Sequence, residues 1–147
     1  MNNIDICTFD VNEPTQINVS SFMQKVLHAL SIDNWNVSVV FCTNSFIANL
    51  NKTYRQKDEP TDVLSFCQQD SNDFKSQCKQ IEAGDIIISL EYLAANAATF
   101  KVSETEELQR LLIHGLLHLK GMDHITNDPS EEMLVLNENL LCELNLH

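Results

Sequence analysis

The pattern of apolar and polar residues predicts about four strands and about five helices along this chain. Alternating or β-branched apolar runs are typical of strands, and they occur at residues 4–10, 36–42, 62–67 and 84–89. Apolar residues recur at helical spacing in five further segments, at residues 20–31, 44–54, 90–97, 108–119 and 133–144. Residues 68–83 are polar and lack a clear period, so we expect a long surface loop there.

Capping residues indicate where several of these helices begin. A serine precedes the helix expected at 20–31, and Thr43 or Asn44 precedes the next one. Ser103 followed by Glu106 forms a capping box, in which each side chain bonds the backbone N–H of the other residue. The segment D-P-S-E at 128–131 has the composition of a helix start and predicts the beginning of the last helix.

The predicted order of elements is β-α-β-α-β-β-α-α-α, which indicates an α+β fold with α/β-like features. We expect a single domain over residues 1–147, because this length can bury a core and no linker or repeat interrupts the pattern. That domain would contain a mixed sheet of about four strands with helices packed against it. The helix at 108–119 has an apolar surround, so we expect it to be buried in the core.

The most distinctive motif of the chain is H-G-L-L-H-L-K-G-M-D-H at residues 114–124. His114 and His118 are four residues apart, so a helix brings both side chains to one face. Gly121 accepts the left-handed backbone that ends a helix, and the turn can bring His124 back over that face. Three imidazoles with one open coordination position are typical of catalytic zinc. We therefore predict one Zn2+ per chain, bound by a zincin-like helix in the core.

The histidine spacing is that of the metzincin peptidases, with one difference. Those peptidases carry glutamate directly after the first histidine, where it acts as the general base, and this chain has Gly115 there. Glycine cannot accept a proton, so we expect the metal site to be kept while the peptidase chemistry is missing. A pair of histidines at this spacing often arises by chance, whereas three with a glycine at the turn are much less easily explained that way.

Composition narrows the class of protein and its surroundings. Hydrophobic residues make up 44% of the chain and charged residues 20%, as in ordinary globular proteins. The sequence predicts no signal peptide and contains no apolar stretch long enough to span a membrane. The five cysteines are odd in number and form no C-x-x-C motif, which predicts free thiols in a reducing cytoplasm.

The charge of the chain argues in two directions. A net charge of −12 argues against nucleic acid as a partner, because phosphate contacts need lysine and arginine. Charge can be local, however, and three of the nine basic residues lie within six positions, namely Lys52, Arg55 and Lys57. An acidic surface with one basic spot is compatible with a small anion-binding site.

Three motifs of this chain together resemble the bacterial YbeY family. They are the histidine motif at 114–124, the segment L-N-K-T-Y-R-Q-K-D-E-P-T-D-V-L-S-F at 50–66, and G-D-I-I-I-S at 84–89. They occur in the order of the family and cover the middle and later parts of the chain. Two departures are Met122, where the family often has an aromatic residue, and Cys67, where it often has proline. Neither is a metal ligand, so neither affects the predicted site.

The resemblance implies a zinc-dependent, single-strand-specific endoribonuclease of the cytoplasm. Its implied roles are maturation of ribosomal RNA, at the 3′ end of the small-subunit RNA, and ribosome quality control. The implied partners are single-stranded RNA, ribosomal RNA and the ribosome or its small subunit, with no DNA and no membrane. A monomer is favoured.

The resemblance also implies roles for individual residues. It implies zinc on the three histidines of the motif and a catalytic arginine at Arg55, whose planar guanidinium can hold two phosphate oxygens. Without the resemblance, Arg55 would be interpreted as a solvated surface residue. Lys57 is a weaker candidate for a phosphate contact. Asp123 either orients an imidazole or caps the turn.

Two other functions stay open on sequence grounds. A ribosome-associated assembly factor without catalytic activity would use its metal structurally, in a closed site with four ligands. We see no fourth cysteine or histidine near the motif, which favours an open site. A metallopeptidase is the second alternative, since the ligand spacing fits it and only the base is missing.

Overall fold

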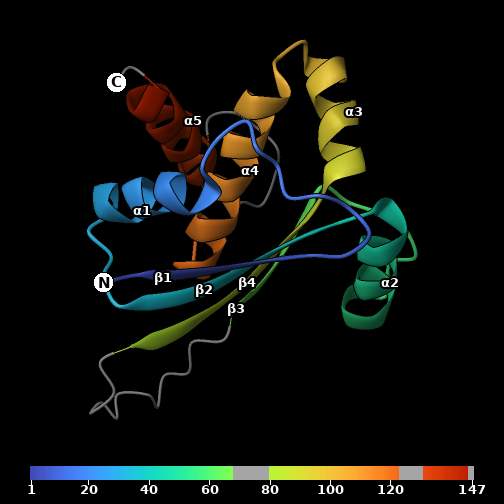
Figure 1. Ribbon diagram of the computed structural model, residues 1–147, viewed down its shortest axis with the longest axis horizontal. Helices are drawn as coiled ribbons and strands as arrows, with labels where there is room; N and C mark the ends of the chain where they lie inside the picture. Colours follow the sequence, from blue (N-terminus) through green and yellow to red (C-terminus); the bar gives the residue numbers. More distant parts are fainter. Residues whose placement is uncertain (68–79, 123–130, 146–147) are drawn as a thin grey trace.

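The computed structural model describes residues 1–67, 80–122 and 131–145, and its elements follow the predicted order (Figure 1). The strands among these residues are β1 (Asn3–Thr8), β2 (Trp35–Cys42), β3 (Val63–Cys67) and β4 (Ile81–Ser89). The helices are α1 (Val19–Ala29), α2 (Asn44–Arg55), α3 (Leu90–Phe100), α4 (Glu104–Leu119) and α5 (Glu132–Asn145). The predicted α+β class and the mixed sheet are confirmed.

The sheet has the strand order β1-β2-β4-β3. β2 is parallel to both β1 and β4, and β3 joins the edge antiparallel to β4. The register of β2 and β4 shifts between Asn36 and Val37, so Ala83 is left as an extra residue next to Gly84. Gly84 has φ +144°, and a Cβ there would lie 2.1 Å from the carbonyl oxygen of Phe66. This bulge therefore needs a glycine.

Two predicted boundaries differ from the structure, and a third cannot be compared with it. Asn18, rather than a serine, caps α1, and its side chain accepts a hydrogen bond from the N–H of Ser21. Asparagine caps a helix as well as serine does, so the apolar pattern alone did not choose between them. The loop expected at 68–83 is too long, because β4 already begins at Ile81, which pairs with β2. The helix start predicted at 128–131 lies almost entirely outside the described residues.

The sheet has a large hydrophobic core on one face and a small one on the other. α1, α4 and α5 cover the first face (Figure 1), where Ile86 and Ile88 of β4 join the large core. α2 packs on the opposite face, where Ile47 and Ile87 belong to the small core. Successive side chains of a strand point to opposite faces, so β4 is buried on both sides as its apolar run predicts.

α4 is the central helix of the large core. Ten of its sixteen residues are buried, and it contacts the other helices of that layer as well as β3 and β4. The prediction that this helix lies in the core is therefore confirmed. No described helix is both long enough and apolar enough to cross a membrane.

Candidate metal centre and its cleft

Local sequence determines where α4 begins and ends. The side chain of Ser103 accepts a hydrogen bond from the N–H of Glu106 at 3.0 Å, as predicted. The carboxylate of Glu106, predicted to bond back to the cap, instead accepts a bond from Arg110. At the other end Gly121 has φ +105°, and its N–H bonds the carbonyl oxygen of His118 at 2.9 Å. The helix therefore ends directly after the second histidine, as the glycine predicts.

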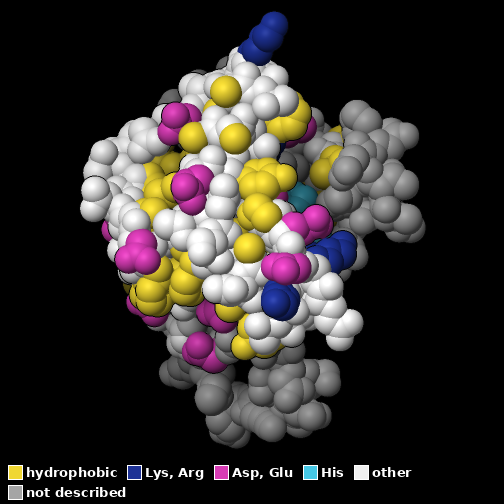
Figure 2. Space-filling view, turned by 90° about the vertical axis from the view of Figure 1, so that its right-hand side faces the viewer, with side chains coloured by type: hydrophobic (Ala, Val, Ile, Leu, Met, Phe, Trp, Pro, Cys, Tyr) yellow, Lys and Arg dark blue, Asp and Glu magenta, His cyan; other side chains and the backbone are white. Residues whose placement is uncertain are grey.

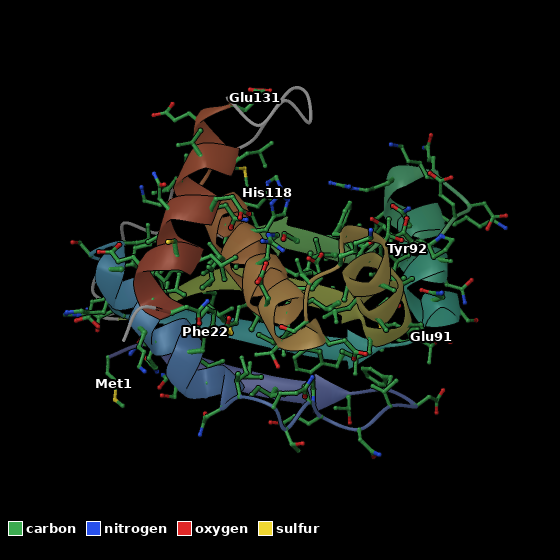
Figure 3. The ribbon with its side chains drawn as sticks, turned by 90° about the horizontal axis from the view of Figure 1, so that it is seen from above. Met1, Phe22, Glu91, Tyr92, His118 and Glu131 are labelled. Atoms are coloured by element: carbon green, nitrogen blue, oxygen red, sulfur yellow. The ribbon has the colours of Figure 1, made fainter. Side chains whose placement is uncertain are left out.

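The two histidines of α4 lie with their rings against each other. The Nε2 atoms of His114 and His118 are 3.0 Å apart, and the ring planes meet at 79°. Both residues are partly exposed, although their neighbours along the helix are buried. Figure 3 shows His118 near the end of α4, on the side of the molecule where α5 begins. The core helix therefore presents both imidazoles at its one accessible strip.

This geometry fits two ligands of one metal ion. Two nitrogens bound to tetrahedral zinc at about 2.0–2.1 Å lie about 3.3 Å apart, close to the observed separation. Without a metal ion, one ring donates its Nε2–H to the Nε2 of the other at this distance. With both lone pairs turned inward the two rings would repel each other, and a shared cation removes that repulsion. Within residues 1–67, 80–122 and 131–145, no three His, Cys, Asp or Glu side chains lie close enough together to hold one metal ion. The predicted third ligand His124 and the neighbouring Asp123 lie outside these residues.

Gly115, between the two histidines, lets α4 pack closely on β4. A Cβ at this position would lie 2.7 Å from Cγ2 of Ile86, and the side chain of Ile86 is completely buried. A glutamate here, as in the metzincin peptidases, would require the helix to move away from the sheet. Packing thus gives a second reason, besides the missing base, against peptidase chemistry.

The histidines open into a cleft of about 720 Å3. Arg55, Lys57 and Thr61 line it from the end of α2 and the segment after it, and Ser65 lines it from β3. In Figure 2 a histidine side chain lies in a hollow between hydrophobic side chains and a mixed group of acidic and basic ones. The structure therefore brings the predicted Arg55 and Lys57 to the same cleft as the histidine pair.

Hydrogen bonds of the buried Asn51 hold the segment that carries these cations. Its carbonyl oxygen accepts from the N–H of Lys57 at 3.3 Å, and its side chain donates to the carbonyl oxygen of Glu59 at 2.9 Å. Gln56, at φ +60°, turns the chain directly after Arg55. Arg55 and Lys57 are exposed, and within the described part of the chain neither forms an ion pair. Both cations can therefore bind an anion in the cleft.

Asp62 is a residue of the cleft that sequence reasoning missed. Its Oδ1 accepts a hydrogen bond from the N–H of Val63 at 2.8 Å, and its Oδ2 accepts one from Asn96 Nδ2 at 3.1 Å. These bonds fix the carboxylate at the boundary between the metal cleft and a second cleft beside it. The available signal was an aspartate directly before a strand and only a few residues after the basic segment.

Fold and site together define an α+β protein with a histidine pair on its core helix and a basic segment facing that pair. The family model described as Endoribonuclease YbeY matches residues 5–145, and this chain belongs to that family. The chain is 49% identical over 127 residues to Endoribonuclease YbeY of Treponema denticola, covering 86% of this chain and 82% of that protein. The resemblance drawn from the three motifs is thus confirmed.

Two further relatives support the same conclusion. Endoribonuclease YbeY of Borreliella burgdorferi is 47% identical over 128 residues, which cover 83% of this chain and 82% of that protein. The solution structure of TM1509 from Thermotoga maritima is similar, with a TM-score of 0.58 and 27% identity. That match covers 96% of this chain and 88% of TM1509, so the likeness extends over the whole domain.

Proposed function

We propose that this protein is a zinc-dependent, single-strand-specific endoribonuclease of the cytoplasm. In this proposal it acts on ribosomal RNA during maturation, at the 3′ end of the small-subunit RNA, and in ribosome quality control. It would work as a monomer of one domain, residues 1–147, on the ribosome or its small subunit. The proposal rests mainly on one observation: the histidine pair and the exposed cations Arg55 and Lys57 line the same cleft. Membership of the family supports cleavage of RNA.

The proposed metal ligands are His114, His118 and His124. The 3.0 Å separation of the first two Nε2 atoms supports a shared ion. When bound, zinc supplies a Lewis acid that polarises a phosphoryl oxygen and acidifies water. Asp123, next to the third ligand, would either orient that imidazole or cap the turn.

Arg55 is the proposed catalytic residue of the chain. Cleavage of a phosphodiester concentrates negative charge on its non-bridging oxygens, and a guanidinium can donate two parallel hydrogen bonds to them. Bonds that strengthen as this charge develops favour the transition state over the bound substrate. Lys57 lines the same cleft and adds a single mobile charge, which suits binding of a neighbouring phosphate.

The test is cleavage of a labelled single-stranded RNA by wild type, Arg55→Ala and Arg55→Lys, with zinc measured on each preparation. We expect Arg55→Ala to lower kcat/KM on the order of 10²–10³-fold. Arg55→Lys should recover only part of the rate, because lysine keeps the charge but loses the fork. Lys52→Ala is the matched control, since Lys52 is an exposed cation of α2 that does not line the cleft. Wild-type rates for Arg55→Ala at equal zinc would contradict the assignment.

The same experiment decides between this function and its rivals. No RNA cleavage by the zinc-loaded wild type would favour a ribosome assembly factor without catalytic activity. Cleavage of an unstructured peptide by the pure protein would favour the metallopeptidase, although Gly115 leaves no room for that enzyme's base.

A further inference from the structure

A second cleft, of about 630 Å3, adjoins the metal cleft. The two clefts have Asp62, Val63, His114 and Leu134 in common, and the remaining walls of the second come from α3, α4 and α5. Because His114 belongs to both, a group bound in the second cleft lies next to whatever occupies the metal centre. For a nucleic acid cut at the metal centre, that neighbour is the nucleotide adjoining the cut.

The charges of the second cleft do not suit a phosphate. Its cation, Arg110, donates to Glu138 at 2.7 Å and to Glu106 and Glu107 at 2.9 Å each. These bonds raise the pKa of Arg110, and the bond to Glu138 contributes most. The guanidinium is thus already paired with carboxylates of the protein. Glu107, Glu138 and Asp62 all line the cleft, so its carboxylates outnumber its one arginine. Such walls attract groups that donate hydrogen bonds and repel anions.

The apolar walls of the second cleft suit a planar ring. Tyr92 and Phe100 contribute aromatic side chains from α3, and Leu111 and Leu134 contribute aliphatic ones. Phe100 is 62% exposed, so its ring has a face available to a ligand. Aromatic side chains at such positions stack on nucleobases without regard to sequence. Figure 2 shows hydrophobic side chains directly beside the histidine of the hollow.

Asn137 of α5 is a buried polar residue with an unsatisfied hydrogen-bond acceptor. It is only 3% exposed and lines the second cleft, yet its Oδ1 has no hydrogen-bond partner among the described residues. A buried acceptor without a partner destabilises a fold, and most are satisfied. Asparagine amides commonly recognise the edges of bases. The Oδ1 atom is covered in the structure, so a base that enters the cleft can supply the missing donor once the amide turns toward it.

We propose that the second cleft binds the nucleobase next to the scissile phosphate and prefers bases with an exocyclic amino group over uracil. This rests on the proposed endoribonuclease function and deepens it. The amino group of adenine, cytosine or guanine donates to the carboxylates and to Asn137. Uracil offers only its N3–H, and the carbonyl oxygens on both sides of that donor are repelled by the same carboxylates. A base in a duplex is stacked and paired and cannot enter. The cleft therefore gives a physical reason for single-strand specificity.

The first test compares labelled oligoadenylate, oligocytidylate and oligouridylate of about twelve nucleotides with the zinc-loaded wild type. In a homopolymer every linkage has the same base on both sides, so the side that the cleft reads does not matter. We expect kcat/KM on the adenine and cytosine chains to exceed that on the uracil chain about tenfold. Fluorescence anisotropy of the same chains should give the same order of affinity. Equal values for all three, or the reverse order, would overturn the proposal.

The second test uses Phe100→Ala and Asn137→Leu. Phe100→Ala should lower kcat/KM on oligoadenylate about tenfold, with zinc content and Tm unchanged, because the ring is exposed. Asn137→Leu should reduce the preference for adenine over uracil while Tm stays equal or rises, because an unpaired buried acceptor is removed. If Asn137 were merely structural, Tm would fall and the preference would persist. Asn139→Ala, an exposed position on the same helix, is the control.

The two proposals fail in different ways. If the wild type cleaves no chain, the endoribonuclease function fails and this proposal fails with it. If it cleaves all three chains equally, and neither variant changes the rates or affinities, the endoribonuclease stands and the base-binding cleft is wrong.

Discussion

At the scale of single residues, the candidate site depends on side chains whose positions along α4 are restricted to a few choices. His114 and His118 must lie one turn apart to bring their Nε2 atoms together. Gly115 between them must lack a side chain, because Ile86 fills the space. The residues proposed to bind the metal and the residue needed for packing on the sheet are therefore neighbours along α4 but lie on different faces of it.

We predict that His118→Ala lowers bound zinc to well below one ion per chain. The variant should also lose the rise in Tm that added zinc produces in the wild type, since a bound ligand stabilises the folded state. Metal analysis and thermal unfolding with and without zinc measure both effects. His28→Ala is a matched control, because His28 is exposed on α1 and does not line the cleft. Unchanged zinc and Tm in His118→Ala would rule out the proposed ligand set.

Gly115→Ala should destabilise the protein although alanine favours helix. The helix gains about 1 kcal/mol from the better helix former, but overpacking against Ile86 costs about 1–3 kcal/mol. We expect a net loss of about 1 kcal/mol in the free energy of unfolding in urea. In the double variant with Ile86→Ala the two changes should cost less together than the sum of the single ones. Simple additivity would show that the contact does not limit the packing.

At the scale of elements, one charged cluster joins α4 to α5 beside the site. Arg110 on α4 bonds Glu138 on α5 and two glutamates of its own helix. Glu107 is almost completely buried, and burial raises the pKa of its carboxyl while the bond from Arg110 lowers it in part. The buried carboxylate of Glu107 therefore depends on its ion pair with Arg110. Glu138, the partner of Arg110 on α5, also forms part of one wall of the second cleft.

Arg110→Ala should make stability more sensitive to pH. Without Arg110, the carboxyl of Glu107 favours its protonated form more strongly, so its pKa in the folded protein is raised further. A carboxyl whose pKa is raised by folding lowers the free energy of unfolding as pH rises above the ordinary value of 4.5. Relative to wild type, we expect a loss of about 1–3 kcal/mol at pH 8 and a smaller one at pH 5. Urea unfolding at both pH values measures this. Adding Glu107→Gln should remove most of the difference, and an equal loss at both pH values would contradict the argument.

At the scale of the whole molecule, the chain is strongly acidic, whereas the cleft beside the histidine pair carries a local positive charge. The net charge is −12, yet the cleft beside the histidine pair receives two of the nine basic residues. An acidic body disfavours indiscriminate binding of nucleic acid, because such binding depends on many phosphate contacts. A substrate would then be held by a few contacts at the site rather than by a broad basic surface.

Binding of single-stranded RNA should therefore depend only weakly on salt. Two phosphate contacts, from Arg55 and Lys57, correspond to a slope of log affinity against log salt of about −1.4. Screening of the repulsion between RNA and the acidic body makes the slope shallower still. Lys57→Ala should reduce its magnitude by about 0.7, and Lys52→Ala should leave it unchanged. Fluorescence anisotropy across a salt series measures it, and a slope steeper than about −3 would mean that further cations contact the RNA.

Much of this protein follows from local sequence. Apolar periodicity predicts the order of all nine described elements, because the period of a buried face is a property of helix or strand geometry. Ser103 and Gly121 predict the two ends of α4, since capping involves only neighbouring residues. The approach of His114 to His118 follows from their spacing on one helix. Arg55 could be singled out only through the resemblance of its segment to the family.

The tertiary structure decided which of these parts meet. β4 lies between β2 and β3, and this order brings the segment after α2 against the end of α4, so Arg55 and the histidines line one cleft. The same packing made Gly115 a steric requirement and gave Asp62 and Asn137 their places at the second cleft. No local pattern specifies such meetings, because contacts between distant segments depend on strand pairing and on which helix faces pack together.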